Sequence, residues 1–214
     1  ERCSVRLAVM HAGVDEHIVV LNMHHIATDG WSGGVLLKDI ATAYNAVVDG
    51  DALDLGGASS LRYADYAQWQ RTMLSDEGRM EPHMRYWCEM LGDELPVLEL
   101  QTDFPRPAII TTRGGKVRVC VDSESAAGLW ALCRECGTTM MRGALAAWAV
   151  VLGKHSGQDD VVVGIPYANR DHPATHSMVG YFVNTLAIRL VLEGMMGFRN
   201  VLALTNVVVS TSLK

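Results

Sequence analysis

The chain has 214 residues, of which 49% are hydrophobic and 20% are charged, so it can bury a substantial core and does not have the composition of a disordered segment. Its net charge of -6 argues against a nucleic-acid partner, because phosphate binding needs clustered Lys and Arg. The longest strongly apolar run, residues 144–152, is well short of the ~20 residues that a membrane-spanning helix needs, so no membrane partner is expected.

Cysteine usage indicates the redox environment. The five cysteines are odd in number and form no regular framework, which predicts reduced thiols and a cytoplasmic protein. Cys133 and Cys136 form a Cys-x-x-Cys, but they fall at the end of an expected helix, where the helix dipole disfavours a thiolate. No second cysteine pair completes a zinc site, so we interpret both residues as packing on a helix face.

The first 50 residues are expected to form a hairpin followed by a helix. Val5, Leu7 and Val9 stand at alternate positions, a turn is expected around Gly13, and residues 18–23 are again apolar. A glycine-rich stretch at 30–34 supplies backbone freedom, and residues 35–46 carry apolar side chains at helical spacing.

Two adjacent histidines, His24 and His25, stand where this apolar run ends. If residues 18–25 form a strand, successive side chains point to opposite faces, so the two imidazoles cannot both reach one small site. A shared metal is therefore not expected, and Asp29 is the only obvious further ligand nearby. One histidine should face a site while the other packs or makes a fixed hydrogen bond. Two structural histidines are the alternative.

The rest of the chain mixes helical and strand-like patterns, which predicts an α/β fold class. Residues 49–60, rich in Gly, Asp and Ser, are expected to form a loop, and residues 102–107, with two prolines, a connector. The expected helices are 63–74, 81–91, 124–136, 139–154 and 198–213, and the expected strands are 116–121, 161–165 and 182–192.

Several of these helices carry further expectations. Tyr63, Tyr66 and Trp69 are spaced to form an aromatic stripe, which is more often core than a ligand platform. Ser123 is a candidate N-cap for the 124–136 helix, and 139–154 is apolar nearly all round and should be buried. Residues 207–211 have poor helix propensity, which weakens the last prediction.

Several motifs in a fixed order resemble the landmarks of one family. The stretch 24–30 reads His-His-x-x-x-Asp-Gly and resembles the signature of the condensation domains of nonribosomal peptide synthetases, within the wider acyltransferase family that includes chloramphenicol acetyltransferase. Further motifs similar to that family follow in family order, at residues 63–70, 86–87, 98–107 with 113–114, 161–170 and 179–185.

The resemblance implies a chloramphenicol-acetyltransferase-like fold of two lobes with an active site in a tunnel between them. Residues 1–75 would be the remainder of the N-terminal lobe, and residues 76–214 a helical connector and the first part of the C-terminal lobe, with a boundary between 60 and 110. It also implies that segments of the family fold are missing before Glu1 and after Lys214.

The chemistry implied by the resemblance is amide formation, in which an amine held on one carrier protein attacks an acyl or peptidyl thioester held on another. No cofactor bound by this chain is implied, and the 4'-phosphopantetheine arms of the carriers enter as substrates. Donor and acceptor peptidyl carrier proteins and a neighbouring adenylation domain are the implied partners. A free α-amine titrates near pH ~8, so the enzyme mainly has to position two tethered substrates and manage one proton.

The same resemblance assigns roles to residues. His25 would face the tunnel and accept a proton or hold the amine, and the amide of Gly30 would stabilise oxyanion charge. His24 and Asp29 would support the site, with Arg170 of the second lobe as the partner of the Asp29 carboxylate.

Three weaker candidates line the tunnel in this reading: Trp31, Ser32 and Asn184. Trp31 and Ser32 are more typical of peptide-bond-forming members than of epimerisation domains. Asn184 is equally well read as a turn asparagine that bonds backbone.

Two other classes of function stay open. One is a related enzyme that epimerises, forms esters or transfers an acyl group from CoA. The other is an inactive chain that serves as a carrier-docking module, which the missing segments favour and the presence of His25, Asp29 and Gly30 disfavours.

Overall fold

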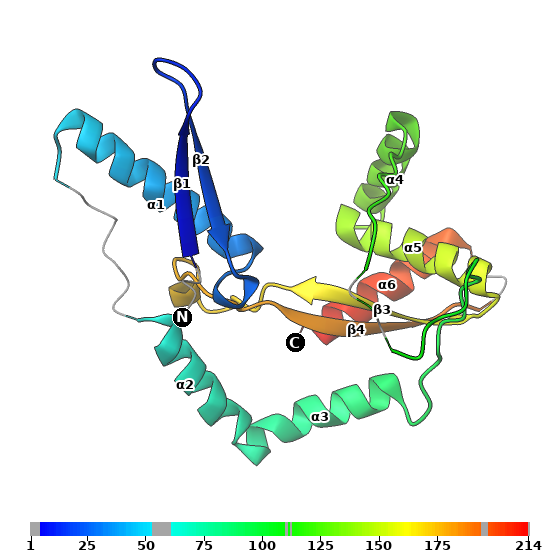
Figure 1. The fold of residues 1–214 in the computed structure, drawn as a ribbon. Helices are drawn as coiled ribbons and strands as arrows, with labels where there is room; N and C mark the ends of the chain where they lie inside the picture. Colours follow the sequence, from blue (N-terminus) through cyan, green and yellow to red (C-terminus); the bar gives the residue numbers. More distant parts are fainter. Residues whose placement is uncertain (1–4, 53–60, 110, 112, 194–196, 214) are drawn as a thin grey trace. The chain divides into compact units, whose positions relative to one another are not determined.

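The chain folds into helices and short strands, as the sequence predicts. A computed structural model describes residues 5–52, 61–109, 111, 113–193 and 197–213, so part of the loop predicted at 49–60 lies outside the described residues. The elements, drawn in Figure 1, are β1 (Val5–His11), β2 (His17–Met23), the 3-10 turn η1 (His25–Ala27), α1 (Gly30–Asp49), α2 (Tyr63–Leu74), α3 (Glu77–Leu91), α4 (Ser123–Glu135), α5 (Met140–Ser156), β3 (Asp160–Tyr167), the 3-10 turn η2 (Pro173–Thr175), β4 (Asn184–Val191) and α6 (Phe198–Ser212).

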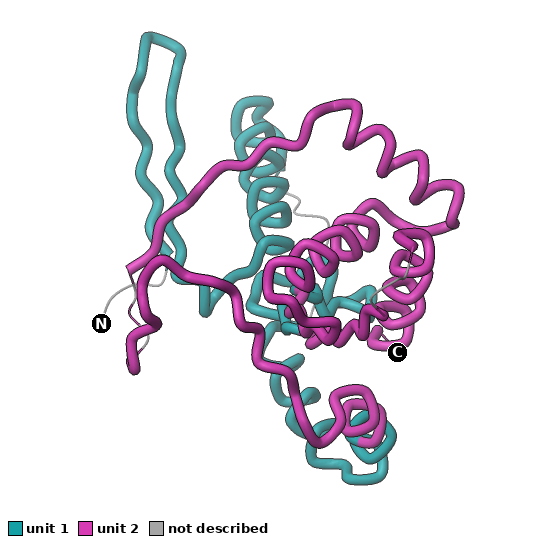
Figure 2. The backbone as a smooth tube through the Cα atoms, turned by 90° about the vertical axis from the view of Figure 1, so that its right-hand side faces the viewer, with its two compact units in different colours: residues 1–84, 166–185 teal, residues 85–165, 186–214 magenta. Residues whose placement is uncertain are grey.

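Two compact units are each assembled from two stretches of sequence (Figure 2). Unit 1 contains residues 1–84 and 166–185, and unit 2 contains residues 85–165 and 186–214. Unit 1 therefore joins the histidine pair to a segment far along the chain. The lobes expected at 1–75 and 76–214 refer to a larger family fold and stay a prediction.

The predicted hairpin is present in unit 1. β1 and β2 pair antiparallel, with Val5 opposite Met23 and His11 opposite His17. Because side chains alternate along a strand, one face of the hairpin carries apolar residues up to its last pair, where His11 lies opposite His17. This face is made by Val5, Leu7, Val9, Val19, Leu21 and Met23.

Helix α1 begins earlier than the predicted 35–46. The side chain of Asp29 accepts a hydrogen bond from Ser32 N at 2.8 Å and so caps a helix that starts at Gly30. At the other end Gly50 adopts a left-handed conformation with φ 74°, and its N–H bonds to Ala46 O. The glycine-rich stretch is therefore the first turn of the helix.

Helices α2 and α3 follow the predicted pattern. α2 spans the predicted 63–74, while α3 begins at Glu77, four residues before the predicted 81. Asp76 accounts for this early start, because its Oδ1 accepts a hydrogen bond from Arg79 N at 3.2 Å.

Unit 2 is organised around α5, α6, β3 and β4. One cluster of buried apolar residues joins them: Leu145, Ala146, Ala149, Leu152, Val161, Ile188, Leu190, Leu192, Val201, Leu202 and Val209. Helix α6 includes the run 207–211 whose propensity is poor, because burial of Val209 outweighs the small intrinsic cost of a β-branched residue. β3 and β4 pair with each other, and the predicted connector at 102–107 has no regular structure.

Several local predictions are wrong. Residues 116–121 form no strand, and Val117 and Val119 are 90% and 82% exposed, because alternation makes a strand only where another strand supplies hydrogen bonds. α5 buries one face only, since Trp148 is 53% exposed. Cys133 packs inside as predicted, whereas Cys136 is exposed at the end of α4.

The cap of α4 also differs from the prediction. Asp122, not Ser123, is the N-cap, because its Oδ1 accepts a hydrogen bond from Ser125 N at 2.8 Å. Ser123 is instead the first residue of the helix.

Candidate active site around His25 and Asp29

The two histidines lie in a turn rather than in a strand. β2 ends at Met23, and His24 and His25 open the short 3-10 turn η1, so the predicted strand over 18–25 is two residues too long. His24 Nδ1 accepts a hydrogen bond from Ile26 N at 3.1 Å, which makes it the N-cap of this turn. His24 therefore makes the fixed hydrogen bond expected of one histidine of the pair.

His25 makes the opposite kind of hydrogen bond. Its Nδ1 lies 2.7 Å from Thr28 O, and because a carbonyl oxygen only accepts, Nδ1 carries the proton. In the neutral ring Nε2 is then left with a lone pair. The ring also lies edge-on to Tyr181, with centroids 5.6 Å apart and planes at 78°. Two adjacent histidines thus hold opposite tautomers, and only His25 offers Nε2 as a base.

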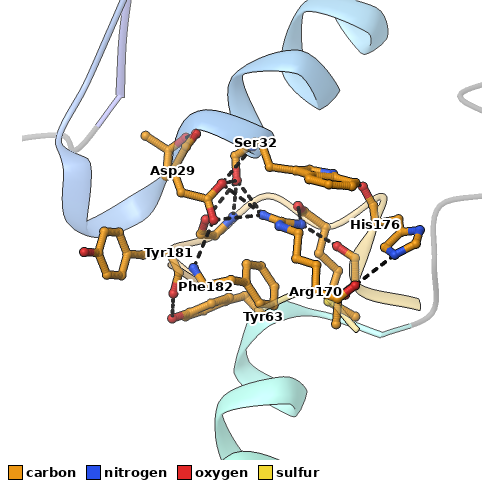
Figure 3. A network of polar contacts seen from close by, with 12 residues as sticks. Asp29, Ser32, Tyr63, Arg170, His176, Tyr181 and Phe182 are labelled. Atoms are coloured by element: carbon orange, nitrogen blue, oxygen red, sulfur yellow. Dashed lines mark hydrogen bonds and ion pairs between the residues drawn. The ribbon is translucent and has the colours of Figure 1, made fainter. Parts of the chain in front are cut away.

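The carboxylate of Asp29 is the centre of a buried hydrogen-bond network (Figure 3). Its Oδ1 lies 2.8 Å from Ser32 N and 2.7 Å from Ser32 Oγ, and its Oδ2 accepts from Phe182 N at 3.1 Å. Arg170 Nη2 is 3.1 Å from Oδ1, and both side chains of this ion pair are almost fully buried. The ion pair predicted from the sequence is present, and it joins residues 141 apart within unit 1.

Arg170 is held from several sides. Its Nη1 donates to the carbonyl oxygens of Thr175 and, at 2.8 Å, Met178, and its guanidinium lies 3.9 Å from the centroid of the Phe182 ring. These bonds tie the guanidinium to the 170–178 segment as well as to Asp29. The ion pair therefore fixes this segment against the start of α1.

Burial and hydrogen bonding act in opposite directions on the pKa of Asp29. Burial raises it, but the hydrogen bonds from Ser32 and Phe182 and the charge of Arg170 outweigh burial, so the pKa lies below its ordinary value. Asp29 is thus a carboxylate at neutral pH, an acceptor of hydrogen bonds with no proton to give. This state suits a structural role better than a catalytic one.

Ser32 and Gly180 close the network. Ser32 is fully buried, and its hydroxyl oxygen lies 2.8 Å from Gly180 O, accepts from Gly180 N at 3.1 Å and accepts from Arg170 Nη2 at 2.9 Å. Gly180 has no room for a side chain, because a Cβ there would lie 2.1 Å from Tyr63 Cδ2. The buried Ser32 hydroxyl therefore links Asp29 and Arg170 to the backbone of Gly180.

The other candidate residues lie around this network. Gly30 is the first residue of α1, and a Cβ there would meet nothing within 4 Å, so among the described residues nothing crowds this position. Trp31 is half-exposed and donates from its indole nitrogen to His176 O at 2.9 Å. Asn184 begins β4 and its Oδ1 accepts from Thr185 N at 2.9 Å, the backbone contact that the structural interpretation expects.

The described part of the chain was searched for metal sites and for membrane-spanning helices. No group of three or more His, Cys, Asp or Glu side chains is arranged there to hold a metal ion. Likewise, none of the helices in those residues combines the length and apolar character needed to cross a bilayer.

Comparison with known proteins decides the family. The family model described as "Condensation domain" matches residues 2–208. The chain belongs to the condensation domain family. The family inferred from the ordered motifs is thereby confirmed.

Similar proteins agree with this membership. The chain is 42% identical over 190 residues to malpibaldin synthetase of Mortierella alpina, a match that covers 89% of this chain and 3% of that protein. The crystal structure of the X-domain from teicoplanin biosynthesis matches with a TM-score of 0.86 and 26% identity, over 99% of this chain and 48% of that one. The first condensation domain of the calcium-dependent antibiotic synthetase matches in fold with a TM-score of 0.75 and 24% identity, over 98% of this chain and 45% of that one.

These matches show the fold of the chain and how much of each relative's length it covers. The fold of this condensation domain is the chloramphenicol-acetyltransferase-like fold that the family resemblance implies. The chain spans about half the length of the solved structures it matches, and a few per cent of malpibaldin synthetase.

Three residues of the site were not predicted from the sequence. Tyr181 contacts the His25 ring, Tyr63 donates from its hydroxyl to Tyr181 O at 2.6 Å, and His176 packs on Trp31 with ring centroids 5.3 Å apart. Tyr63 and Tyr181 belong to motifs that carry the resemblance, which was the available signal. Nothing in the local pattern distinguished His176.

Proposed function

We propose that this condensation domain forms an amide bond between an acyl or peptidyl thioester on a donor carrier protein and the amine of an aminoacyl group on an acceptor carrier protein. The observation that supports this most directly is the tautomer of His25. Its Nδ1–H is committed to Thr28 O, so its Nε2 is free to accept a proton or a hydrogen bond from an amine.

The reaction needs no covalent enzyme intermediate. The amine nitrogen attacks the thioester carbonyl carbon and loses a proton as the tetrahedral intermediate forms. The carbon–sulfur bond then breaks, and the carrier thiolate that leaves takes up this proton to become the thiol. His25 Nε2 accepts the proton or hydrogen bond from the amine in this scheme. The amide of Gly30, at the positive end of the 20-residue helix α1, is our candidate to stabilise the charge on the carbonyl oxygen.

Asp29 and Arg170 serve this chemistry indirectly. They hold the 170–178 segment and the start of α1 together, and α1 follows directly on the η1 turn that carries His25. Because the turn is fixed, the His25 ring keeps one orientation, and its Nε2 is already in position when the two carrier-bound substrates bind.

The substrates and partners belong to the same proposal. The 4'-phosphopantetheine arms of the carriers would present both substrates, so this chain itself would bind no cofactor. A neighbouring adenylation domain would supply the aminoacyl group. The four described cysteines are free, which supports a cytoplasmic location for the assembly.

A carrier-to-carrier transfer assay on the full-length protein that contains these residues tests the proposal. His25→Asn keeps an amide donor near Thr28 O but has no group at the position of Nε2, so we expect the rate to fall by at least about 10²-fold with an unchanged melting temperature. His83→Ala, at an exposed histidine of α3, is the matched control and should keep the parent rate.

The size of the loss separates the possible roles. A His25→Gln variant that regains most of the rate would show that His25 holds the amine by a hydrogen bond and is not the base. Equal rates for the parent and His25→Asn would overturn the proposal and favour a carrier-docking module. Transfer from CoA to a diffusible acceptor in place of transfer between carriers would assign the chain to the alternative acyltransferases.

A further inference from the structure

Unit 1 contains an open cavity next to the network around Asp29, and two residues whose carbonyl oxygens accept from Arg170, Thr175 and Met178, belong to its lining. Its volume is 390 Å³, within the range of small-molecule sites, and it lies where α2 meets the 169–178 segment. Neither His25 nor Asp29 lines it. The chemically distinctive residues around it are Asp65, Tyr66, Trp69, Asn169, Asp171 and His172.

An aromatic wall forms one side of the cavity. The rings of Tyr66 and Trp69 have centroids 5.6 Å apart, and Trp69 is 52% exposed, so its indole is accessible from the cavity. The Tyr66 oxygen lies 3.2 Å from both Gln70 Nε2 and Asn169 Nδ2, and these bonds hold the phenol ring in place. The sequence interpretation of this stripe as core is therefore wrong at Trp69.

Two carboxylates lie in the same lining and each keeps one oxygen for a ligand. Asp65 Oδ2 accepts from Arg62 N at 2.7 Å, and Asp171 Oδ1 accepts from the Tyr167 hydroxyl. Among the described residues, neither Asp65 Oδ1 nor Asp171 Oδ2 has a hydrogen-bond donor. Both free oxygens are therefore available to a cation.

The positive charge next to these carboxylates is already paired, because the guanidinium of Arg170, the chain neighbour of Asp171, is buried against Asp29 and donates to Met178 O. Neither lysine nor arginine is among the described residues that line the cavity. Of the lining residues that the structure describes, His172 is the one with a basic side chain, and its Nδ1 accepts from Ala174 N at 3.2 Å, an arrangement that leaves Nδ1 without a proton. Two acidic groups beside an exposed indole and a tyrosine ring combine the two features that recognise organic cations, an opposite charge and an aromatic face.

We propose that this cavity binds an organic cation, an ammonium or guanidinium group on an apolar stem. The cation lies against the Trp69 indole and the carboxylates of Asp65 and Asp171, and the stem packs along the apolar remainder of the lining. The same chemistry is offered by a small amine and by a Lys or Arg side chain of a partner protein. This proposal does not depend on the proposed function, because neither His25 nor Asp29 lines the cavity.

The test uses the indole N–H signals of the five tryptophans in ¹⁵N NMR, with the Trp69 signal assigned from its loss in Trp69→Phe. Phenethylammonium chloride is the cationic probe, and phenylethanol is its neutral control of nearly equal shape. We expect a saturable shift of the Trp69 signal, with affinity about tenfold higher for the cation than for the alcohol and weaker at high salt.

Variants locate the charge that matters. Asp65→Asn and Asp171→Asn each keep an oxygen that accepts from Arg62 N or from the Tyr167 hydroxyl, so the local structure is preserved. The double variant should bind the cation no more tightly than the alcohol. If the double variant is unfolded, as a loss of NMR dispersion would show, the parent chain provides the test. A higher affinity for the cation than for the alcohol, which decreases at high salt, then supports the proposal, and equal affinities overturn it.

Two peptides distinguish the source of the cation. An acetylated Gly-Arg-Gly amide is compared with its citrulline counterpart, which has the same shape without the charge. Binding of the arginine peptide alone supports a partner side chain, and binding of phenethylammonium alone supports a small amine. Equal binding of cation and alcohol, unchanged binding by the double variant, or no shift up to about 10 mM of any probe overturns the proposal.

Discussion

Asp29 shows how much one side chain can organise. Its carboxylate receives hydrogen bonds from Ser32, Phe182 and Arg170, which come from three separate parts of unit 1. Removing the negative charge leaves the guanidinium of Arg170 buried without its counter-ion. The energetic consequence should therefore be much larger than for an exposed ion pair.

We predict that Asp29→Asn lowers the free energy of unfolding by about 3 kcal/mol, because breaking a buried ion pair leaves an uncompensated charge. Chemical denaturation measures this. Glu135→Gln, which removes a comparable pair with Arg199 whose side chains are 60% and 62% exposed, should change stability little. The double variant Asp29→Asn with Arg170→Gln should lose less than the sum of the two single variants. A parent-like denaturation curve for Asp29→Asn would contradict the structural role.

The pH dependence of stability follows from the same residue. The pKa of Asp29 is lower in the folded chain than its ordinary value of 3.8, so the unfolded chain binds this proton more readily. The contribution of Asp29 is present above that value and is lost as the pH falls through the folded pKa. Melting temperatures measured from pH 6 downward should drop more steeply for the parent than for Asp29→Asn. Parallel curves would contradict this assignment.

At the scale of elements, burial decides where intrinsic propensity is weak. Helix α6 contains the β-branched run at 207–211, yet it is helical to Ser212 because one side of it packs into the core of unit 2. Val209 is fully buried and Val207 is 62% exposed, although they are two residues apart on one helix.

This pair of valines gives a matched test. Val209→Ala should lower the free energy of unfolding by about 2 kcal/mol, because it removes buried methyl groups and leaves a cavity. Val207→Ala should not destabilise the chain, since alanine is the better helix former and little burial is lost. Thermal and chemical denaturation measure both. Similar losses at the two positions would contradict the described packing of α6.

At the scale of the whole molecule, the chain leaves apolar surface uncovered. Leu7 and Val9 on the apolar face of the hairpin are 60% and 53% exposed, and Val117 and Val119 are more so. Contiguous apolar surface such as the hairpin face marks places where a protein contacts something else.

We predict that the chain enhances the fluorescence of anilinonaphthalene sulfonate, a dye that binds exposed apolar surface. The double variant Leu7→Thr with Val9→Thr should reduce this signal while changing the melting temperature little, because these side chains are already half in solvent. Leu202→Ala, at a fully buried position, should instead cost about 3 kcal/mol of stability. An unchanged dye signal in the double variant would show that the hairpin face is covered.

The sequence by itself determined the family, the mixed fold class, the hairpin, the bounds of α2 and the partner of Asp29. Each of these depends on order along the chain, either as a local period or as a motif recognised residue by residue. Tertiary structure decided the opposite tautomers of His24 and His25, the burial of Ser32, the exposure of Trp69 and Cys136, and the absence of a strand at 116–121 among the described residues. These depend on partners elsewhere in the fold: Ser32 bonds Gly180 across 148 residues, and a strand needs a neighbour that its own alternation cannot supply.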